Sequence, residues 1–162
     1  MSHVARFMVA IATLQVSSAC GTPQGEAESP AQGAAAAPFL RGFNFGNRLD
    51  APNEGEWGPP LRASDFATVA ARGFDHVRLP VRFSAHAATT APFAIDTGLL
   101  ERVDWALAQA SQNGLSLVLA LQYYDELNQQ PGAHAERFIG LWDQLALRYQ
   151  SESPQLAVAR RD

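Results

Sequence analysis

Three times between residues 39 and 150, a short apolar run is followed by a stretch with helical periodicity, and this alternation strongly constrains the fold. Apolar residues that recur every three to four positions predict amphipathic helices, whereas short apolar runs predict strands. Each strand-and-helix unit takes about 40 residues or fewer, which suits right-handed βαβ crossovers and therefore an α/β fold with a parallel sheet. The predicted strands are 39–46, 74–81 and 115–124, and the predicted helices are 62–73, 95–114 and 135–150.

Local signals mark the ends of several of these elements. Residue types that cap or stop helices stand where the helical patterns begin and end, namely Ser64 and Asp96 before them and Gly73 and Gly114 after them. Pro80 has no backbone N–H, so we expect the pairing of its strand to end there. The nearly continuous apolar run 115–121 predicts a strand that is buried on both faces. PQLAV, at 154–158, is a candidate start of a fourth strand.

Composition and charge narrow the class of protein. Of the 162 residues, 47% are hydrophobic and 17% are charged, which is typical of a globular chain and not of a disordered one. The formal net charge is −4 and no basic stripe occurs, so a nucleic-acid partner is not expected. The four histidines and Cys20 lack the spacing of metal ligands, and no glycine-rich phosphate loop is present. We therefore expect no metal and no other cofactor.

The N-terminal region has the pattern of an export signal followed by a linker. A weakly basic start, the apolar stretch 7–16 and small residues before Cys20 are typical of a signal peptide, and the stretch is too short to span a bilayer. Cys20 also fits a bacterial lipoprotein, although Ser17 stands where such signals usually carry Leu. The alternative is a translation start further downstream.

We accordingly predict three segments. They are a signal peptide, in either its cleaved or its lipoprotein form, over 1–20, a flexible linker over 21–37 and a globular domain over 38–162. The expected location is outside the cell or in the cell envelope, and a lipid on Cys20, in the lipoprotein form, is the only membrane contact expected.

Candidate functional residues stand where the predicted strands end, because side chains at the carboxyl ends of parallel strands form the sites of α/β folds. These positions carry Asn44, Asn47, Arg78, Gln122, Tyr123 and Tyr124. A buried cation is costly unless it is paired, so we expect a carboxylate beside Arg78, and a purely structural ion pair with Asp50 or Glu54 is the alternative to a functional role. Asp125 and Glu126 are adjacent and point to opposite sides, so we interpret them as loop acids at the strand exit and not as a catalytic pair.

Trp57 lies in the Gly- and Pro-rich loop after the first predicted strand. Exposed aromatic rings near amides and carboxylates suit a carbohydrate, because sugar C–H faces stack on the ring while the hydroxyl groups take the hydrogen bonds. The alternative is a Trp that only packs this loop onto the domain, as most Trp side chains are buried.

Four sequence blocks together resemble the N-terminal part of family 5 glycoside hydrolases, the cellulase-type (β/α)8 TIM barrels. The blocks are RGFNFGNRLDAPNEGEWG, GFDHVRLPVRFSAHA, IDTGLLERVDWAL and YYDELNQQPGAHAERFIGLWDQLALRY, and they cover roughly residues 39–150. The resemblance implies a partial barrel of about three βα units and a β-linked polysaccharide such as cellulose as the partner. It further implies a retaining mechanism with two glutamates and without a metal or organic cofactor. Arg78 would orient the nucleophilic carboxylate, and Asn47 and Trp57 would border the sugar cleft.

Two departures from the family pattern modify this prediction. Members commonly carry His-His-Tyr at the end of the third strand, where this chain has Gln122, Tyr123 and Tyr124. The Asn-Glu-Pro motif of the acid/base and the nucleophilic glutamate of the seventh strand do not occur in these 162 residues, as in a truncated or frame-shifted gene product. We therefore assign no catalytic residue and expect the polypeptide alone to be inactive.

Two other classes of function stay open at this point. One is a non-catalytic carbohydrate-binding surface protein that uses Trp57, Tyr123 and Tyr124 as stacking platforms. The other is a relic without function that does not fold.

Overall fold

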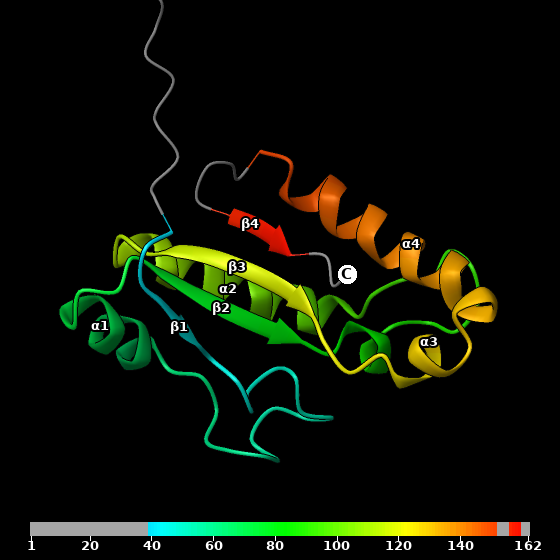
Figure 1. Cartoon of the computed structure of the whole chain (residues 1–162), viewed down its shortest axis with the longest axis horizontal. Helices are drawn as coiled ribbons and strands as arrows, with labels where there is room; N and C mark the ends of the chain where they lie inside the picture. The colour runs from blue at the N-terminus through cyan, green and yellow to red at the C-terminus, as the bar shows by residue number, and fades with distance from the viewer. Residues whose placement is uncertain (1–38, 152–155, 160–162) are drawn as a thin grey trace, which may run out of the picture. The chain divides into compact units, whose positions relative to one another are not determined.

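The computed structural model describes residues 39–151 and 156–159 (Figure 1). The predicted signal peptide and linker lie outside the described residues. Four strands form one sheet in which every neighbouring pair is parallel and the strand order follows the chain order. They are β1 Gly42–Asn44, β2 His76–Val81, β3 Ser116–Leu121 and β4 Leu156–Ala159. Parallel strands that neighbour each other in sequential order are how α/β barrels are built, so the predicted partial α/β barrel is confirmed.

The helices alternate with the strands, as the periodicity predicts. They are α1 Ala63–Ala71, α2 Thr97–Gln112, α3 Asp125–Gln129 and α4 Pro131–Tyr149, and a 3₁₀ helix, η1, spans Phe83–His86. Helix α1 contacts α2, and α2 packs against β3 on the far side of the sheet in Figure 1. In the described part of the chain, no helix is both long and apolar enough to cross a membrane.

Several element boundaries differ from the prediction. Strand β1 is confined to three residues within 39–46, and α4 begins at Pro131, four residues before the predicted start at 135. Proline is favoured in the first helical turn because its missing N–H needs no partner there. Helix α3 was not predicted, and it places Asp125 and Glu126 in the first turn of a helix and not in a loop.

The predicted helix stops and one of the two predicted N-caps are confirmed. The Asp96 side chain accepts a hydrogen bond from the Leu99 N–H at 3.0 Å, as an N-cap should. Gly73 and Gly114 have φ angles of 77° and 68°, in the left-handed region that ends helices. The prediction for Ser64 is wrong, because the N-cap of α1 is Arg62 and Ser64 lies inside the helix.

The prediction that pairing ends at Pro80 is also wrong, since β2 continues to Val81 and Pro80 lies opposite Ala120 of β3. The direction of the ladder explains why proline is tolerated. The Arg78 carbonyl accepts from Phe45 on the β1 side, whereas the Val81 carbonyl accepts from Gln122 on the β3 side. Backbone groups alternate in direction along a strand, so the missing N–H of Pro80 faces the β1 side, beyond the end of β1.

The core lies between the sheet and its helices. Val77, Leu79 and Val81 of β2 and Leu117 and Leu119 of β3 are fully buried. The apolar stripes of the helices pack against them and contain the following buried residues: Phe66 and Val69 of α1, Leu99, Val103, Ala106, Leu107 and Ala110 of α2, and Leu141, Leu145 and Tyr149 of α4. These stripes follow the predicted periodicity, although Phe138 and Trp142 are only partly buried.

Loss of core volume in β3 should destabilise the domain strongly. Leu119→Ala is expected to lower the free energy of unfolding by about 2–5 kcal/mol, because Leu119 is fully buried and its truncation leaves a cavity. Leu147→Ala is the matched control; its side chain is 70% exposed, and the expected change is below about 0.5 kcal/mol. Urea denaturation followed by circular dichroism measures both, and equal effects would contradict this description of the core.

The long loop between β1 and α1 is held to α2 by an ion pair. Arg102 of α2 donates to both Glu54 carboxylate oxygens, from Nε at 2.9 Å and from a terminal nitrogen at 2.8 Å. The Leu61 N–H also donates to Glu54, at 2.8 Å. Burial raises the pKa of Glu54, but the bonds from Arg102 and Leu61 lower it by more, so the net pKa lies below its ordinary value.

The lowered pKa of Glu54 predicts a pH-dependent contribution to stability. A carboxyl with a depressed pKa in the folded state stabilises above its unfolded pKa of about 4.3 and loses that contribution as pH falls through the folded pKa. Glu54→Gln should therefore cost about 1–3 kcal/mol at pH 7, and the difference from the unmodified chain should vanish in strong acid. Glu56→Gln is the control, because Glu56 is exposed in the same loop and bonds only the Asn53 amide among the described residues. A Glu54→Gln penalty that is independent of pH would contradict the assignment.

Candidate functional site

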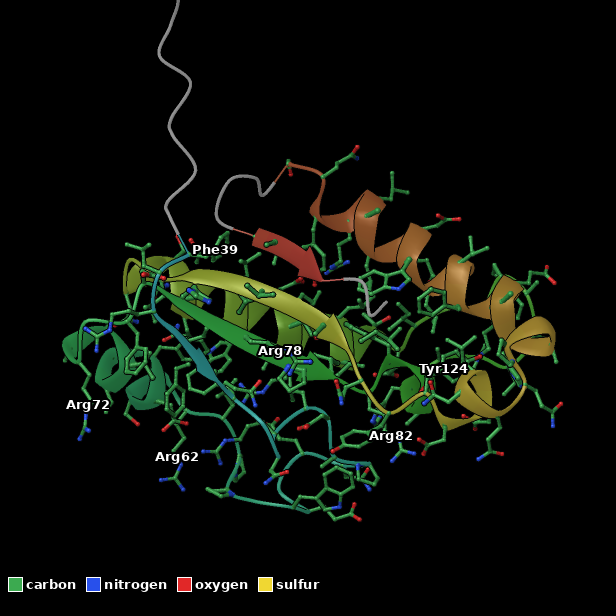
Figure 2. All side chains as sticks on the ribbon, viewed as in Figure 1. Phe39, Arg62, Arg72, Arg78, Arg82 and Tyr124 are labelled. Atoms are coloured by element: carbon green, nitrogen blue, oxygen red, sulfur yellow. The ribbon has the colours of Figure 1, made fainter. Side chains whose placement is uncertain are left out.

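A hydrogen-bond network near the carboxyl edge of the sheet centres on Arg78 (Figure 2). Arg78 lies on β2 in register with Asn44, the last residue of β1, and Gln122 follows the end of β3. One terminal nitrogen of Arg78 donates to Asn44 Oδ1 at 2.9 Å, and the other donates to Gln122 Oε1 at 3.0 Å. The guanidinium therefore joins three neighbouring strands through two amide oxygens.

The expectation of a carboxylate beside Arg78 is wrong for the described residues. No Asp or Glu in that part of the chain forms an ion pair with Arg78. Glu54 pairs with Arg102 instead, and Asp50 is buried, where it accepts from the Arg48 N–H at 2.9 Å. Neutral amide oxygens accept from both terminal nitrogens of Arg78, but they leave its positive charge without a counter-charge.

A pair of exposed aromatic rings adjoins this network in sequence. Trp57, in the loop after β1, and Tyr123, next to Gln122, meet edge to face with ring centroids 5.3 Å apart and planes at 88°. Trp57 is 41% exposed and Tyr123 is 37% exposed, so both rings keep surface open to solvent. Trp57 thus contacts an element far away in sequence and still presents part of its ring.

The Tyr123 backbone takes an uncommon conformation to reach this position. Its φ angle is 53°, in the left-handed region that bulky residues seldom adopt. Ser84 of η1 donates from its hydroxyl to the Tyr123 carbonyl oxygen at 3.4 Å. Unusual backbone conformations persist where surrounding contacts compensate for their cost, which is often at functional sites.

The two remaining predicted site residues are placed differently. Tyr124 is 3% exposed, close to α3 in Figure 2, so its ring is covered and does not provide the expected stacking platform. Asn47 is exposed, with a φ angle of 60°, and its carbonyl oxygen lies against Gly58, the neighbour of Trp57. Among the described residues, no hydrogen bond joins the Asn47 side chain to the Arg78 network.

A groove of about 670 Å³ continues from Tyr123 between the end of β3 and helices α3 and α4. Its lining is mostly apolar and includes Leu121, Leu127, Phe138 and Trp142. The Trp142 indole N–H is buried and has no acceptor among the described residues. The volume is in the range of ligand-binding clefts in proteins.

The acids near this edge serve structural contacts. Asp125 pairs with Arg82 at 3.6 Å, which ties the start of α3 to the end of β2. Glu54 and Asp50 are likewise engaged, by Arg102 and by the Arg48 N–H. The described residues also contain no cluster of His, Cys, Asp or Glu suited to a metal ion. The Arg78 network and the neighbouring rings provide aromatic faces, amides and a cation, which are groups suited to binding polar ligands.

Sequence reasoning missed Arg137, a buried cation at this end of the sheet. Arg137 is 9% exposed and lies four residues before Leu141 on the buried face of α4. Its guanidinium donates to the carbonyl oxygens of Ser84, Ala87 and Ala88. The available signal was its spacing, since an arginine that continues an apolar stripe at helical period must be buried with acceptors.

Comparisons with known proteins agree with this geometry. The family model described as cellulase (glycosyl hydrolase family 5) matches residues 33–159. Endoglucanase H of Acetivibrio thermocellus is 32% identical over 115 residues, which are 71% of this chain and 13% of that protein. A xyloglucan-specific endo-beta-1,4-glucanase of Bacteroides ovatus is 29% identical and matches 73% of this chain and 27% of its own length. The chain therefore spans a minor part of these relatives.

Solved structures show the same relationship. Thermotoga maritima Cel5A, in a complex with mannotriose, superposes with a TM-score of 0.73 at 40% sequence identity, over 74% of this chain and 39% of that one. The family match over most of the chain, the sequence identity and the parallel strand order all point to one family. The chain belongs to the cellulase family of glycoside hydrolases, family 5.

Proposed function

We propose that this chain is part of a hydrolase domain that cleaves β-linked glucan, and that its described residues supply sugar-binding side chains and not the catalytic carboxylates. The observation that carries the proposal is the exposed Trp57–Tyr123 pair next to the Arg78 network at the carboxyl edge of the sheet. In (β/α)8 barrels this edge is where substrates bind.

The chemistry of these side chains suits a sugar. Pyranose rings have apolar C–H faces that stack on aromatic rings, and hydroxyl groups that need donors and acceptors. Trp57 and Tyr123 offer the partly exposed rings, while the amides of Asn47 and Gln122 offer both donors and acceptors. Arg78, whose charge has no counter-ion among the described residues, would orient the nucleophilic carboxylate of the complete domain, as the resemblance implies.

The relatives favour glucan as the substrate class. They include endoglucanases from several bacteria, and one relative is named as specific for xyloglucan. Structures of Thermotoga maritima Cel5A hold mannotriose or cellobiose, so mannan belongs to the range to be tested. Hydrolysis in the complete domain would use two glutamates in a retaining double displacement.

Binding without hydrolysis by the 162-residue chain is the expected result. Affinity electrophoresis in gels that contain soluble β-glucan measures binding, and release of reducing sugar from the same glucan measures hydrolysis. Trp57→Ala should weaken binding by about 1 kcal/mol, or roughly five-fold in Kd, because one stacking face is lost. Phe39→Ala is the matched control, since Phe39 is 46% exposed but packs against His76 at the start of β2.

The two measurements can contradict the proposal separately. Migration that glucan and mannan leave unchanged would exclude sugar binding by these residues. Equal effects of the Trp57 and Phe39 substitutions would remove the aromatic pair from the site. Hydrolysis by the purified chain would show that catalytic groups are present after all.

Export of the protein to the cell envelope is the second part of the proposal. Its support is the apolar stretch at 7–16, which ends in small residues before Cys20. Expression in a bacterium with labelled palmitate distinguishes the two forms of the signal: a lipoprotein incorporates label, which Cys20→Ser abolishes and Ser17→Ala retains. Export without label would support a cleaved signal peptide, and retention of the full-length chain in the cytoplasm would contradict export.

A further inference from the structure

Arg137 of helix α4 contacts two segments near the site, the η1 region after β2 and the residues after β3. Its Nε donates to the Ala88 carbonyl oxygen at 3.1 Å, and one terminal nitrogen donates to those of Ser84 at 2.8 Å and Ala87 at 2.9 Å. The other terminal nitrogen lies 3.5 Å from the Tyr124 hydroxyl, and the guanidinium carbon lies 5.4 Å from the centre of the Tyr124 ring. Arg137 therefore contacts both the η1 region after β2 and the residue that follows Tyr123.

Burying a cation in this position costs free energy, which contacts with acceptors must offset. Removing an arginine from water costs several kcal/mol unless its N–H groups find acceptors. The acceptors of Arg137 are carbonyl oxygens and a phenol, and no carboxylate in the described part of the chain forms an ion pair with it. The flat, forked guanidinium satisfies three carbonyl groups at once, which a lysine or an apolar residue does not reproduce.

The segment that Arg137 holds leads directly to the aromatic pair. Ser84, whose carbonyl accepts from Arg137, donates from its hydroxyl to the Tyr123 carbonyl oxygen. Two contacts therefore link Tyr123 to Arg137. The Tyr123 carbonyl oxygen accepts from Ser84, and Tyr124, the next residue in the chain, lies against Arg137. Its backbone is in the left-handed region, with a φ angle of 53°, and its ring meets Trp57 with the two ring planes at 88°.

We propose that Arg137 is a positioning residue for the Trp57–Tyr123 pair, which it orders through Ser84 and Tyr124 without touching the ligand. The inference rests on the proposed function only in that the pair is taken as the sugar platform. The geometry of the pair exists without sugar, so it can be tested independently of binding.

Near-ultraviolet circular dichroism of the full chain tests the proposal. The Trp57-dependent signal is the difference between each variant and the same variant with Trp57→Phe, which removes the contributions of Trp105 and Trp142. Arg137→Met keeps an apolar side chain in the buried position but removes the hydrogen bonds to the carbonyl groups of Ser84, Ala87 and Ala88. The variant should therefore lose most of this signal. Arg148→Met is the matched control on the same helix; Arg148 pairs with Asp104, and the signal should stay unchanged.

Ser84→Ala separates positioning from stability. It leaves the carbonyl groups for Arg137 in place and removes only the hydroxyl that contacts Tyr123. The expected result is a reduced Trp57-dependent signal at an unchanged melting temperature, and this variant decides the test if Arg137→Met does not fold. An unchanged signal in Ser84→Ala, or in a folded Arg137→Met variant, would overturn the proposal.

Affinity for soluble β-glucan provides the functional measurement. A folded Arg137→Met variant should lose binding by about the same factor as Trp57→Ala, roughly five-fold. If the unmodified chain binds no glucan, the proposed function fails, whereas the spectroscopic comparison still tests Arg137. Full glucan affinity in a variant that has lost the Trp57-dependent signal would overturn the role of Arg137 in recognition.

Discussion

The alternation of side chains along β2 and β3 determines on which face of the sheet Arg78 lies. Val77 and Leu79 pair in register with Leu117 and Leu119, and all four side chains are fully buried. Arg78, between the first two, must then point to the opposite face of the sheet. A slip of one residue would expose this apolar set and bring Arg78 among the helices, so the same packing free energy that holds the core also fixes the orientation of the cation.

Arg78 and Arg137 both bond neutral acceptors near this edge, and their surroundings differ in a way that matches their proposed roles. Arg137 is almost fully buried, and three of its acceptors are carbonyl oxygens of the main chain, so moving it would disturb the backbone. Arg78 is half-buried and bonded to two side-chain amides, which can rotate. A guanidinium bound by movable neutral groups keeps its charge available to a carboxylate or a polar ligand, whereas one bound by fixed carbonyl groups serves to hold structure.

The strongly periodic elements were predictable because their signals are local. The stripe of α2, the cap at Asp96 and the strands β2 and β3 each depend on residues within one or two turns of each other. The features that the sequence did not reveal depend on distant partners. The carbonyl acceptors of Arg137 lie 49 to 53 residues earlier in the chain, and Pro80 is tolerated only because β1 ends before it. The contact of Trp57 with Tyr123 is of the same kind, since only the folded chain brings the two loops together.

Gln122 shows most directly how this chain departs from the pattern of its family. The resemblance places a histidine at this position, and a histidine changes its charge near neutral pH. The Gln122 amide does not titrate, and Asn44, the other partner of Arg78, does not either. The contacts of Arg78 therefore persist at any pH at which the arginine is charged. The two side chains that hold Arg78 therefore contribute no pH dependence of their own to this network.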